Sequence, residues 1–427
     1  MSDFRLPGGM MATTNLENRL PEGSDRRFLL RANAGRRQAD QESSNLLPGV
    51  DIEDEVARST PATYLFILLS VLIIGVVSVR SINSQLAPLL YDDRHVFDVG
   101  EALGKGNSYL TYDLNIETRG MRRESIRSLD EKPDLAVMGA SHWQEADGAI
   151  MPSVNFYNAH IHRDYYEDLV AVAGWFYEFD RMPEKIVISI RDNQFTPVEA
   201  RTDFLWVPVL PYYREIAHLF GLEPHSAYAN GLTPRLRQSV SLPVLSNNIE
   251  RFIEATSQPE VSDTQMHETL DVLLPDGGIY WSEKHRRGFT AERARFESIA
   301  LAEAKIASPP TLDPEGLKTF DRVLEFFVQH GVEVYITHPP FNPIFWEAVQ
   351  GTQYMPALHR VEAAVQDLAD KHGLAVIGGF NPHEVGCTSD MYIDGEHANP
   401  LCLGEILLQA YEGARHTAAL ASARVRQ

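Results

Sequence analysis

The longest uninterrupted apolar run lies near the N-terminal end of the chain. Residues 64–79 read YLFILLSVLIIGVVSV, and no charged residue occurs between Ser59 and Val79. About 20 apolar residues cross a bilayer core, and residues 61–63 bring the run close to that length. The alternative is a buried core helix, which normally has a polar face. We therefore predict a transmembrane helix over residues 59–80, which lies too far along the chain for a cleaved signal peptide.

Polar sequence surrounds this run. Residues 1–58 are rich in charged and small polar residues without a sustained period, which predicts a disordered tail. Residues 81–130 are punctuated by glycines and predict a connector. Basic residues close to the run are nearly balanced between its two sides, so they do not set the orientation. Because the tail carries many arginines, we expect a single-pass protein of the inner or plasma membrane with a cytoplasmic N-terminus and an extracytoplasmic C-terminal domain.

Five short apolar runs follow between residues 131 and 427. They are continuous rather than alternating, rich in β-branched residues and bounded by turn residues, which is typical of parallel strands buried on both faces. They lie at Leu135–Met138, Val154–Tyr157, Ile186–Ile190, Val332–Thr337 and Leu374–Ile377. Helical periodicity separates them at Tyr165–Phe179, Pro314–Gln329, Val361–His372 and Leu401–Tyr411. This alternation predicts an α/β domain, a three-layer doubly wound sheet of about five parallel strands.

Residues 200–312 interrupt the alternation between the third and fourth runs. We expect an insertion over the strand ends, with helices near Ile249–Ala255 and Glu292–Ile306. The insertion concentrates large aromatic residues, which favour packing within it over ligand contact. They are Trp206, Tyr212, Tyr213, Tyr280 and Trp281.

Composition removes several classes of function. The formal net charge is −21, which argues against nucleic-acid binding. The two cysteines do not form a C-x-x-C pair, which excludes a cysteine-based zinc site.

Three histidines, His160, His162 and His338, suggest a metal site at first. Residues two apart on an extended segment face opposite sides, however, and no complete ligand set is present. We expect neither a metal nor a cofactor.

Ligands of doubly wound sheets bind beyond the carboxyl ends of the strands, so the residues that follow each strand are the candidates for chemistry. Gly139, Ala140 and Ser141 follow the first strand. A serine at this turn presents its Oγ at the sheet edge, and its N–H can hold an oxyanion. The alternative is a capping box formed with Gln144.

An Asp-x-x-His pair follows the fifth strand. Asp394 and His397 can meet in one loop, where the carboxylate would orient the imidazole and the imidazole would take a serine proton. The alternative is a turn at Asp394-Gly395 followed by an Asn399-Pro400 helix start. That alternative explains the aspartate and the asparagine but not the histidine.

Two other strand ends carry candidates. Asn193 follows the third strand, where its amide could reach an oxyanion or form an Asx-turn. His338 follows the fourth strand, where it could shape a pocket or have a structural role.

Together these residues resemble the SGNH (GDSL-like) hydrolase superfamily over roughly residues 133–415. Ser141 matches the nucleophile after the first strand, Asp394 and His397 match the late Asp-x-x-His block, and Asn193 approximately matches the third block. Two departures are evident. Gly-Ala-Ser replaces the common Gly-Asp-Ser, and the chain reads Asn158-Ala159-His160 where the second block has glycine.

The resemblance implies roles for these residues and a class of function. Ser141, Asn193 and Ala159 would hold the oxyanion, and Asn158, His338 and Trp143 would contact substrate. The expected function is a membrane-anchored, serine-dependent acyl ester hydrolase or O-acyltransferase of a cell-envelope polysaccharide or glycan, working with other envelope acyltransferase components. A non-catalytic binding or assembly module for polysaccharide modification or export is the alternative.

Cys387 and Cys402 flank the Asp-x-x-His loop. In an exported domain they could form a disulfide that pins this loop. Two separate buried thiols are the alternative, and the sequence leaves both open.

Overall fold

The computed structural model describes residues 61–90, 93–111, 118–201, 209–223, 261–262 and 267–411. The predicted tail over 1–58, the predicted helix near Ile249–Ala255 and the aromatic residue Trp206 lie outside the described residues.

Helix α3 (Pro61–Leu90) contains the long apolar run. Its segment Tyr64–Ile82 has 19 residues, is long and apolar enough to cross a membrane, and contains no buried residue in its most apolar stretch. A soluble core helix of this length would bury most of its surface. The helix extends ten residues beyond the end that the apolar pattern predicted at residue 80.

Five parallel strands form the main sheet, as predicted. In sheet order they are β3 (Phe156–Asn158), β2 (Leu135–Met138), β4 (Lys185–Ser189), β8 (Glu333–Thr337) and β9 (Ala375–Ile377). Numbered along the chain, this is the order 2-1-3-4-5 of a doubly wound sheet. The order reverses between β2 and β4, so the residues that follow β2 lie at the switch point where such folds bind ligands.

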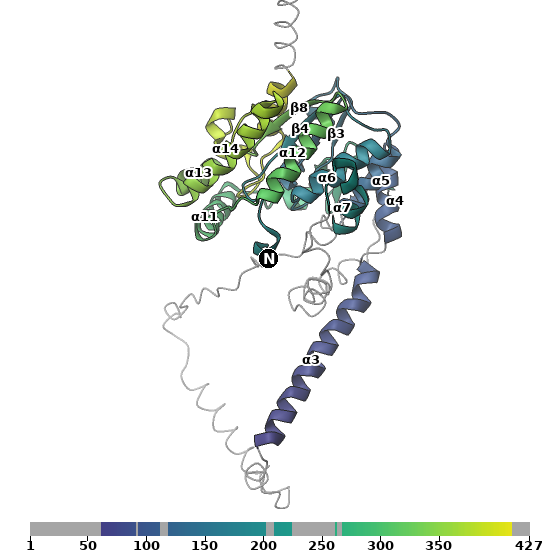
Figure 1. The fold of residues 1–427 in the computed structure, drawn as a ribbon, viewed down its shortest axis with the longest axis vertical. Coiled ribbons are helices and arrows are strands. Elements are labelled where there is room, and N and C mark those ends of the chain that lie inside the picture. The colour runs from purple at the N-terminus through teal and green to yellow at the C-terminus, as the bar shows by residue number, and fades with distance from the viewer. Residues whose placement is uncertain are drawn as a thin grey trace, which may run out of the picture. The chain divides into compact units, whose positions relative to one another are not determined.

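Helices cover both faces of this sheet, because successive side chains of a strand point to opposite faces. Ala136 and Met138 of β2 pack in one core with α6 (Tyr166–Glu178), α7 (Leu210–Ile216), α12 (Pro314–Gln329) and α14 (Tyr354–His372). Leu135 and Val137 pack in a second core with the helical residues 400–411. Figure 1 shows α6 and α12 lying across one face of the sheet. The three-layer prediction is confirmed.

The described part of the segment predicted as a connector is folded, which corrects that prediction. It forms α4 (Asp93–Gly104), β1 (Ser108–Thr111) and α5 (Thr118–Ser128). Gly100 and Gly104 had suggested breaks, but they let α4 approach α5. A β-carbon at Gly100 would clash with the carbonyl oxygen of Met121. Glycine here serves close packing between helices rather than a turn.

Strand β1 joins the insertion in a second, antiparallel sheet. The order is β5 (Val261–Ser262), β1, β6 (Asp271–Leu273) and β7 (Ile279–Tyr280). The insertion also supplies α10 (Glu283–Arg286) and α11 (Ala291–Ala307), and α13 (Pro343–Val349) follows β8. Helix α11 confirms the prediction for Glu292–Ile306. Of the insertion's described aromatic residues, Tyr213 lies in the main core and Tyr212 packs edge-on against Trp175 of α6.

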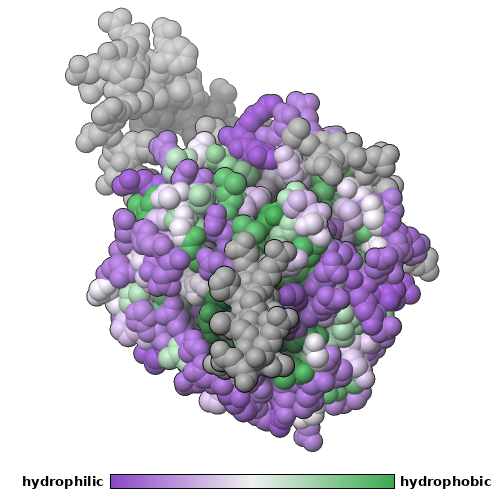
Figure 2. Space-filling view, turned by 90° about the horizontal axis from the view of Figure 1, so that it is seen from above, coloured by the Kyte–Doolittle hydropathy of each residue, from purple (hydrophilic) through white to green (hydrophobic). Residues whose placement is uncertain are grey.

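The described surface carries many polar residues on the face that Figure 2 shows. Figure 2 shows one face of the molecule, on which hydrophilic residues predominate and hydrophobic residues form smaller groups. A surface of this kind agrees with a net charge of −21.

Candidate active site

Ser141 opens a short 3₁₀ helix directly after β2. Gly139 makes the turn possible, since its φ is +152° and a β-carbon there would lie 2.8 Å from the Cβ of Ser189. The cap of the 3₁₀ helix is Ala140, and no side chain makes a capping hydrogen bond. The capping alternative for Ser141 is therefore wrong, and the hydroxyl is available for another partner. Ser141 itself is 8% exposed.

That partner is His397, from the far end of the chain. Ser141 Oγ lies 3.0 Å from His397 Nε2, and His397 Nδ1 lies 2.7 Å from Asp394 Oδ2. The second carboxylate oxygen of Asp394 accepts the backbone N–H groups of Glu396 and His397 at 2.9 and 2.8 Å. Asp394 thus holds the turn with one oxygen and the imidazole with the other. The turn and the triad are both present, and they do not compete.

The charges around His397 favour its protonated form. Burial alone would lower the pKa of this imidazole, but the Asp394 charge and hydrogen bond, aided by Glu396 and Glu145, raise it to about 9. His397 in turn holds the pKa of Asp394 below its usual value, against the effect of burial. Burial raises the pKa of Glu145 to about 7. The site therefore stabilises an imidazolium at His397, the form that arises when histidine takes a serine proton.

Sequence reasoning missed two residues of this site, His142 and Glu396. Glu396 Oε2 lies 3.7 Å from His142 Nε2, and the rings of His142 and His397 have centroids 5.6 Å apart. Each residue is next to a triad member in the sequence. That adjacency was the only available signal, because neither residue fits a periodic pattern.

The two predicted backbone oxyanion donors, the N–H groups of Ser141 and Ala159, differ in whether they already have a hydrogen-bond acceptor. Among the described residues, no acceptor is bound by the Ser141 N–H, which leaves it available. The Ala159 N–H donates to the Val137 carbonyl at 2.7 Å, as an extension of the β2–β3 pairing. It cannot also serve an oxyanion, so the prediction for Ala159 is wrong.

Asn193 does not form the alternative Asx-turn in the described structure. Its backbone carbonyl accepts the N–H of Thr196 at 3.2 Å, while its side-chain Oδ1 is buried without a partner among the described residues. No hydrogen bond between Asn193 and Ser141 or His397 occurs in the described part of the chain. Asn193 therefore remains a prediction.

The residues predicted to contact substrate are buried in structural roles. The Asn158 amide donates to the carbonyls of Trp143 and Ala146, at 2.6 and 2.8 Å. Trp143 has no exposed surface and packs in the second core. His338 is 2% exposed, bonds to the Ile190 carbonyl at 2.8 Å and stacks on Phe380. These contacts contradict the predicted substrate role of Asn158 and Trp143, and for His338 they favour the structural alternative.

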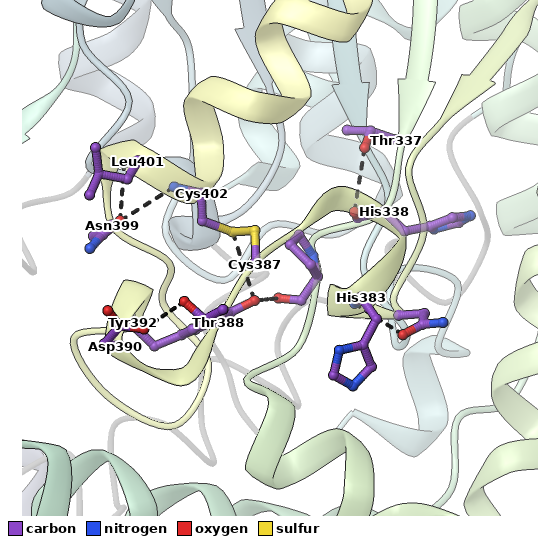
Figure 3. Close-up of a disulfide and its surroundings, with 12 residues drawn as sticks. Thr337, His338, His383, Cys387, Thr388, Asp390, Tyr392, Asn399, Leu401 and Cys402 are labelled. Atoms are coloured by element: carbon purple, nitrogen blue, oxygen red, sulfur yellow. Dashed lines mark hydrogen bonds between the residues drawn. A yellow bond between two sulfur atoms is a disulfide. The ribbon is translucent and has the colours of Figure 1, made fainter.

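A disulfide between Cys387 and Cys402 closes the loop that carries Asp394 and His397. Figure 3 shows it joining this loop to the start of the last helix. Asn399 caps that helix, since its Oδ1 accepts the N–H groups of Leu401 and Cys402 at 3.0 and 3.3 Å. Of the two alternatives for the cysteines, the structure has the disulfide.

The insertion covers the same region. Gly395 lies against α11, where a β-carbon would be 2.8 Å from the carbonyl carbon of Glu297. The Ile279 N–H donates to the Gln144 carbonyl at 2.7 Å, three residues after Ser141. Lys305 of α11 pairs with buried Asp192 at 2.6 Å. The insertion thus lies over the carboxyl ends of the strands, as expected.

The histidines considered for metal binding have other surroundings. His160 is buried with its Nδ1 3.1 Å from the Arg122 guanidinium, and burial keeps the pKa of His160 well below its usual value. Burial lowers the pKa of His162 to about 3. Within the described ranges, no group of three or more potential ligands is arranged to hold a metal ion.

No family model matches this chain, and no curated protein matches it either. The geometry of the site is therefore the evidence that bears on function.

Proposed function

We propose that this protein is an SGNH-like, serine-dependent acyl ester hydrolase or O-acyltransferase. The observation that carries the proposal is the chain of contacts from Ser141 Oγ to His397 Nε2 and from His397 Nδ1 to Asp394. A serine is a useful nucleophile only beside a base that a third group orients. Here all three groups are within hydrogen-bond reach, at the switch point of a doubly wound sheet.

The residues would act in two half-reactions. Ser141 Oγ bonds to the ester carbonyl carbon while its proton passes to His397 Nε2, and the Ser141 N–H binds the resulting oxyanion. The carbon–oxygen bond to the leaving alcohol then breaks, and His397 returns the proton to that alcohol. Water or a glycan hydroxyl attacks the acyl-serine by the same steps in reverse. Which of these two acceptors enters decides between hydrolysis and transfer.

The surroundings of the site support a place in the cell envelope. Helix α3 is long and apolar enough to anchor the protein in the inner or plasma membrane. The Cys387–Cys402 disulfide favours an oxidising compartment, so the catalytic domain would be extracytoplasmic and the N-terminus cytoplasmic. The substrate we propose is an acylated cell-envelope polysaccharide or glycan.

The proposal is tested by labelling the full-length protein in detergent with a serine-directed phosphonate. Mass spectrometry should find one adduct, on the peptide that contains Ser141. Ser141→Ala should lose both the adduct and turnover of a chromogenic acetyl ester, while Ser153→Ala, an exposed serine, should lose neither. Full ester turnover by Ser141→Ala, with no adduct in the parent protein, would refute the mechanism.

A second candidate is a non-catalytic module that binds glycan for polysaccharide modification or export. The observation that favours it is the occupied N–H of Ala159, which leaves the oxyanion without the second donor expected there. Such a module would bind glycan fragments in calorimetry yet form no phosphonate adduct at Ser141.

A further inference from the structure

A second histidine–carboxylate pair lies beside the triad and comes from the same two segments. His142 follows the nucleophile Ser141, and Glu396 precedes the base His397. Their facing atoms, His142 Nε2 and Glu396 Oε2, are 3.7 Å apart. The side chain of His142 is 10% exposed and that of Glu396 is 36% exposed. The imidazole that Glu396 faces lies next to that of His397, since the His142 and His397 rings have centroids 5.6 Å apart.

The backbone fixes Glu396 in this place. Its N–H donates to Asp394 Oδ1 at 2.9 Å, which ties the residue to the carboxylate that orients His397. The preceding residue, Gly395, lies against the backbone of α11, so the loop cannot move away from the insertion without opening that contact. A carboxylate that lies beside an imidazole before the reaction begins acts as a preorganised charge, which costs little reorganisation during the reaction.

Partial burial opposes the charged form of both residues, but the surroundings of Glu396 keep it charged. Its pKa is lowered well below the usual value, since His142, His397 and Lys305 outweigh the effect of burial. The pKa of His142 is lowered, mainly by burial, with His397 and Arg191 adding to the effect and Glu396 opposing it. The pair is thus a neutral imidazole and a carboxylate, and the net charge that it presents to His397 is negative.

We propose that His142 and Glu396 are positioning residues, with Glu396 stabilising the His397 imidazolium that forms in each half-reaction and His142 holding Glu396 in place. This inference rests on the proposed function. Two acidic groups would then serve one imidazole. Asp394 orients the imidazole through Nδ1, and Glu396 adds charge without touching either nitrogen in the described contacts.

The charge of Glu396 should affect both the midpoint and the high-pH plateau of kcat/KM plotted against pH. It stabilises the imidazolium equally in the resting protonated enzyme and in the transition state. Glu396→Gln should therefore move the midpoint of kcat/KM downward by about one pH unit and lower the high-pH plateau up to about tenfold. At low pH the two profiles should meet, because there both states carry the imidazolium. A general loss of packing would instead lower activity by the same factor at every pH.

Other titratable and charged groups lie near His397, His142 and Glu396. The variants must leave these groups unchanged if the pH profile is to report on Glu396 alone. Those that act on His397, His142 or Glu396 are Asp394, Glu145, His160, His162, Arg191 and Lys305. A matched control is Glu325→Gln on the exposed side of α12, which should leave both midpoint and plateau at the values of the parent protein.

The experiment uses the full-length protein in detergent and a chromogenic acetyl ester, corrected for spontaneous hydrolysis. His142→Gln should shift the profile in the same direction as Glu396→Gln, and the double variant should match Glu396→Gln alone, because His142 acts only through Glu396. Glu396→Asp should restore part of the midpoint shift.

Two results would overturn the inference, and they differ. Ser141-dependent turnover with a Glu396→Gln profile parallel to that of the parent protein, displaced equally at all pH values, would refute the role of the pair alone. Absence of Ser141-dependent turnover in the parent protein would refute the proposed function and this inference with it.

Discussion

Gly395 lies directly against the backbone of Glu297, so the Asp394–His397 loop and the insertion helix α11 meet with no side chain between them. A β-carbon at Gly395 would be 2.8 Å from the carbonyl carbon of Glu297 and 2.9 Å from the N atom of Ser298. Both are backbone atoms, which cannot swing aside as the end of a flexible side chain can. The loop that carries Asp394 and His397 therefore takes part of its position from a segment about 100 residues earlier in the chain.

Gly395→Ala should displace this loop from α11. We expect a loss of about 1–3 kcal/mol in the free energy of unfolding and a larger relative loss in kcat, because His397 moves with the loop. Urea unfolding and ester turnover measure the two effects. The control is Gly404→Ala in the last helix, where the β-carbon would meet only a side-chain methyl of Ile150, at 3.3 Å. Equal kcat for Gly395→Ala and the parent protein would show that the contact does not position the site.

Asn158 provides a second test, since its two amide hydrogens hold the turn after Ser141. Asn158→Asp replaces those donors with acceptors that face the carbonyls of Trp143 and Ala146. We expect a loss of about 2–4 kcal/mol in the free energy of unfolding. Asn155→Asp is the control, because that exposed amide makes one hydrogen bond, to the Lys132 carbonyl. If Asn158→Asp left the free energy of unfolding unchanged and raised KM, the result would favour substrate contact by Asn158 over a structural role.

The main sheet was predictable because its central strands β2 and β4 are buried on both faces. Runs such as Leu135–Met138 are apolar at every position, and burial on both sides leaves no alternation to misread. Helix α12 begins and ends at the predicted residues, since Asp313 caps it and Pro314 occupies its first position. The proximity of Ser141, Asp394 and His397 was predictable in the same way, because strand ends of a parallel sheet meet at one edge.

Features that depend on register and tertiary packing were not predictable. The second sheet has strands of two to four residues, too short for any period to develop. Which acceptor the Ala159 N–H binds depends on the register between β2 and β3, and residue type alone does not determine that register. The position of Asn158 depends on the turn between β6 and β7, since its N–H donates to the Asp276 carbonyl at 2.6 Å, and that turn lies more than 100 residues further along the chain.

The Cys387–Cys402 disulfide should stabilise the loop that it closes. The cysteines are 15 residues apart, and closing a loop of that length is worth about 3 kcal/mol in the chain-entropy model. Cys387→Ser with Cys402→Ser should lower the free energy of unfolding by about this amount and reduce kcat, because Asp394 and His397 lie inside the loop. Treatment of the parent protein with a reductant should have the same effect, while the double variant should not respond to reductant. A parent protein indifferent to reductant would contradict the role of the disulfide.

The raised pKa of His397 makes the free energy of unfolding depend on pH. The folded protein holds this proton up to a pKa of about 9, whereas an unfolded histidine releases it near its ordinary value of 6.5. The proton therefore favours the folded state below pH 6.5, and this contribution is lost as the pH rises through 9. Between these values we expect the free energy of unfolding to fall by up to about 1.4 kcal/mol per pH unit.

Urea unfolding of the full-length protein at a series of pH values measures this slope. Asp394→Asn removes the charge that raises the pKa of His397 and should flatten the curve between pH 6.5 and 9. Asp370→Asn, a change on α14 outside the contacts of the site, should keep the slope of the parent protein. If the Asp394→Asn protein kept the full slope as well, another group would be responsible, and the Asp394–His397 hydrogen bond would not be the source of the imidazolium's stability.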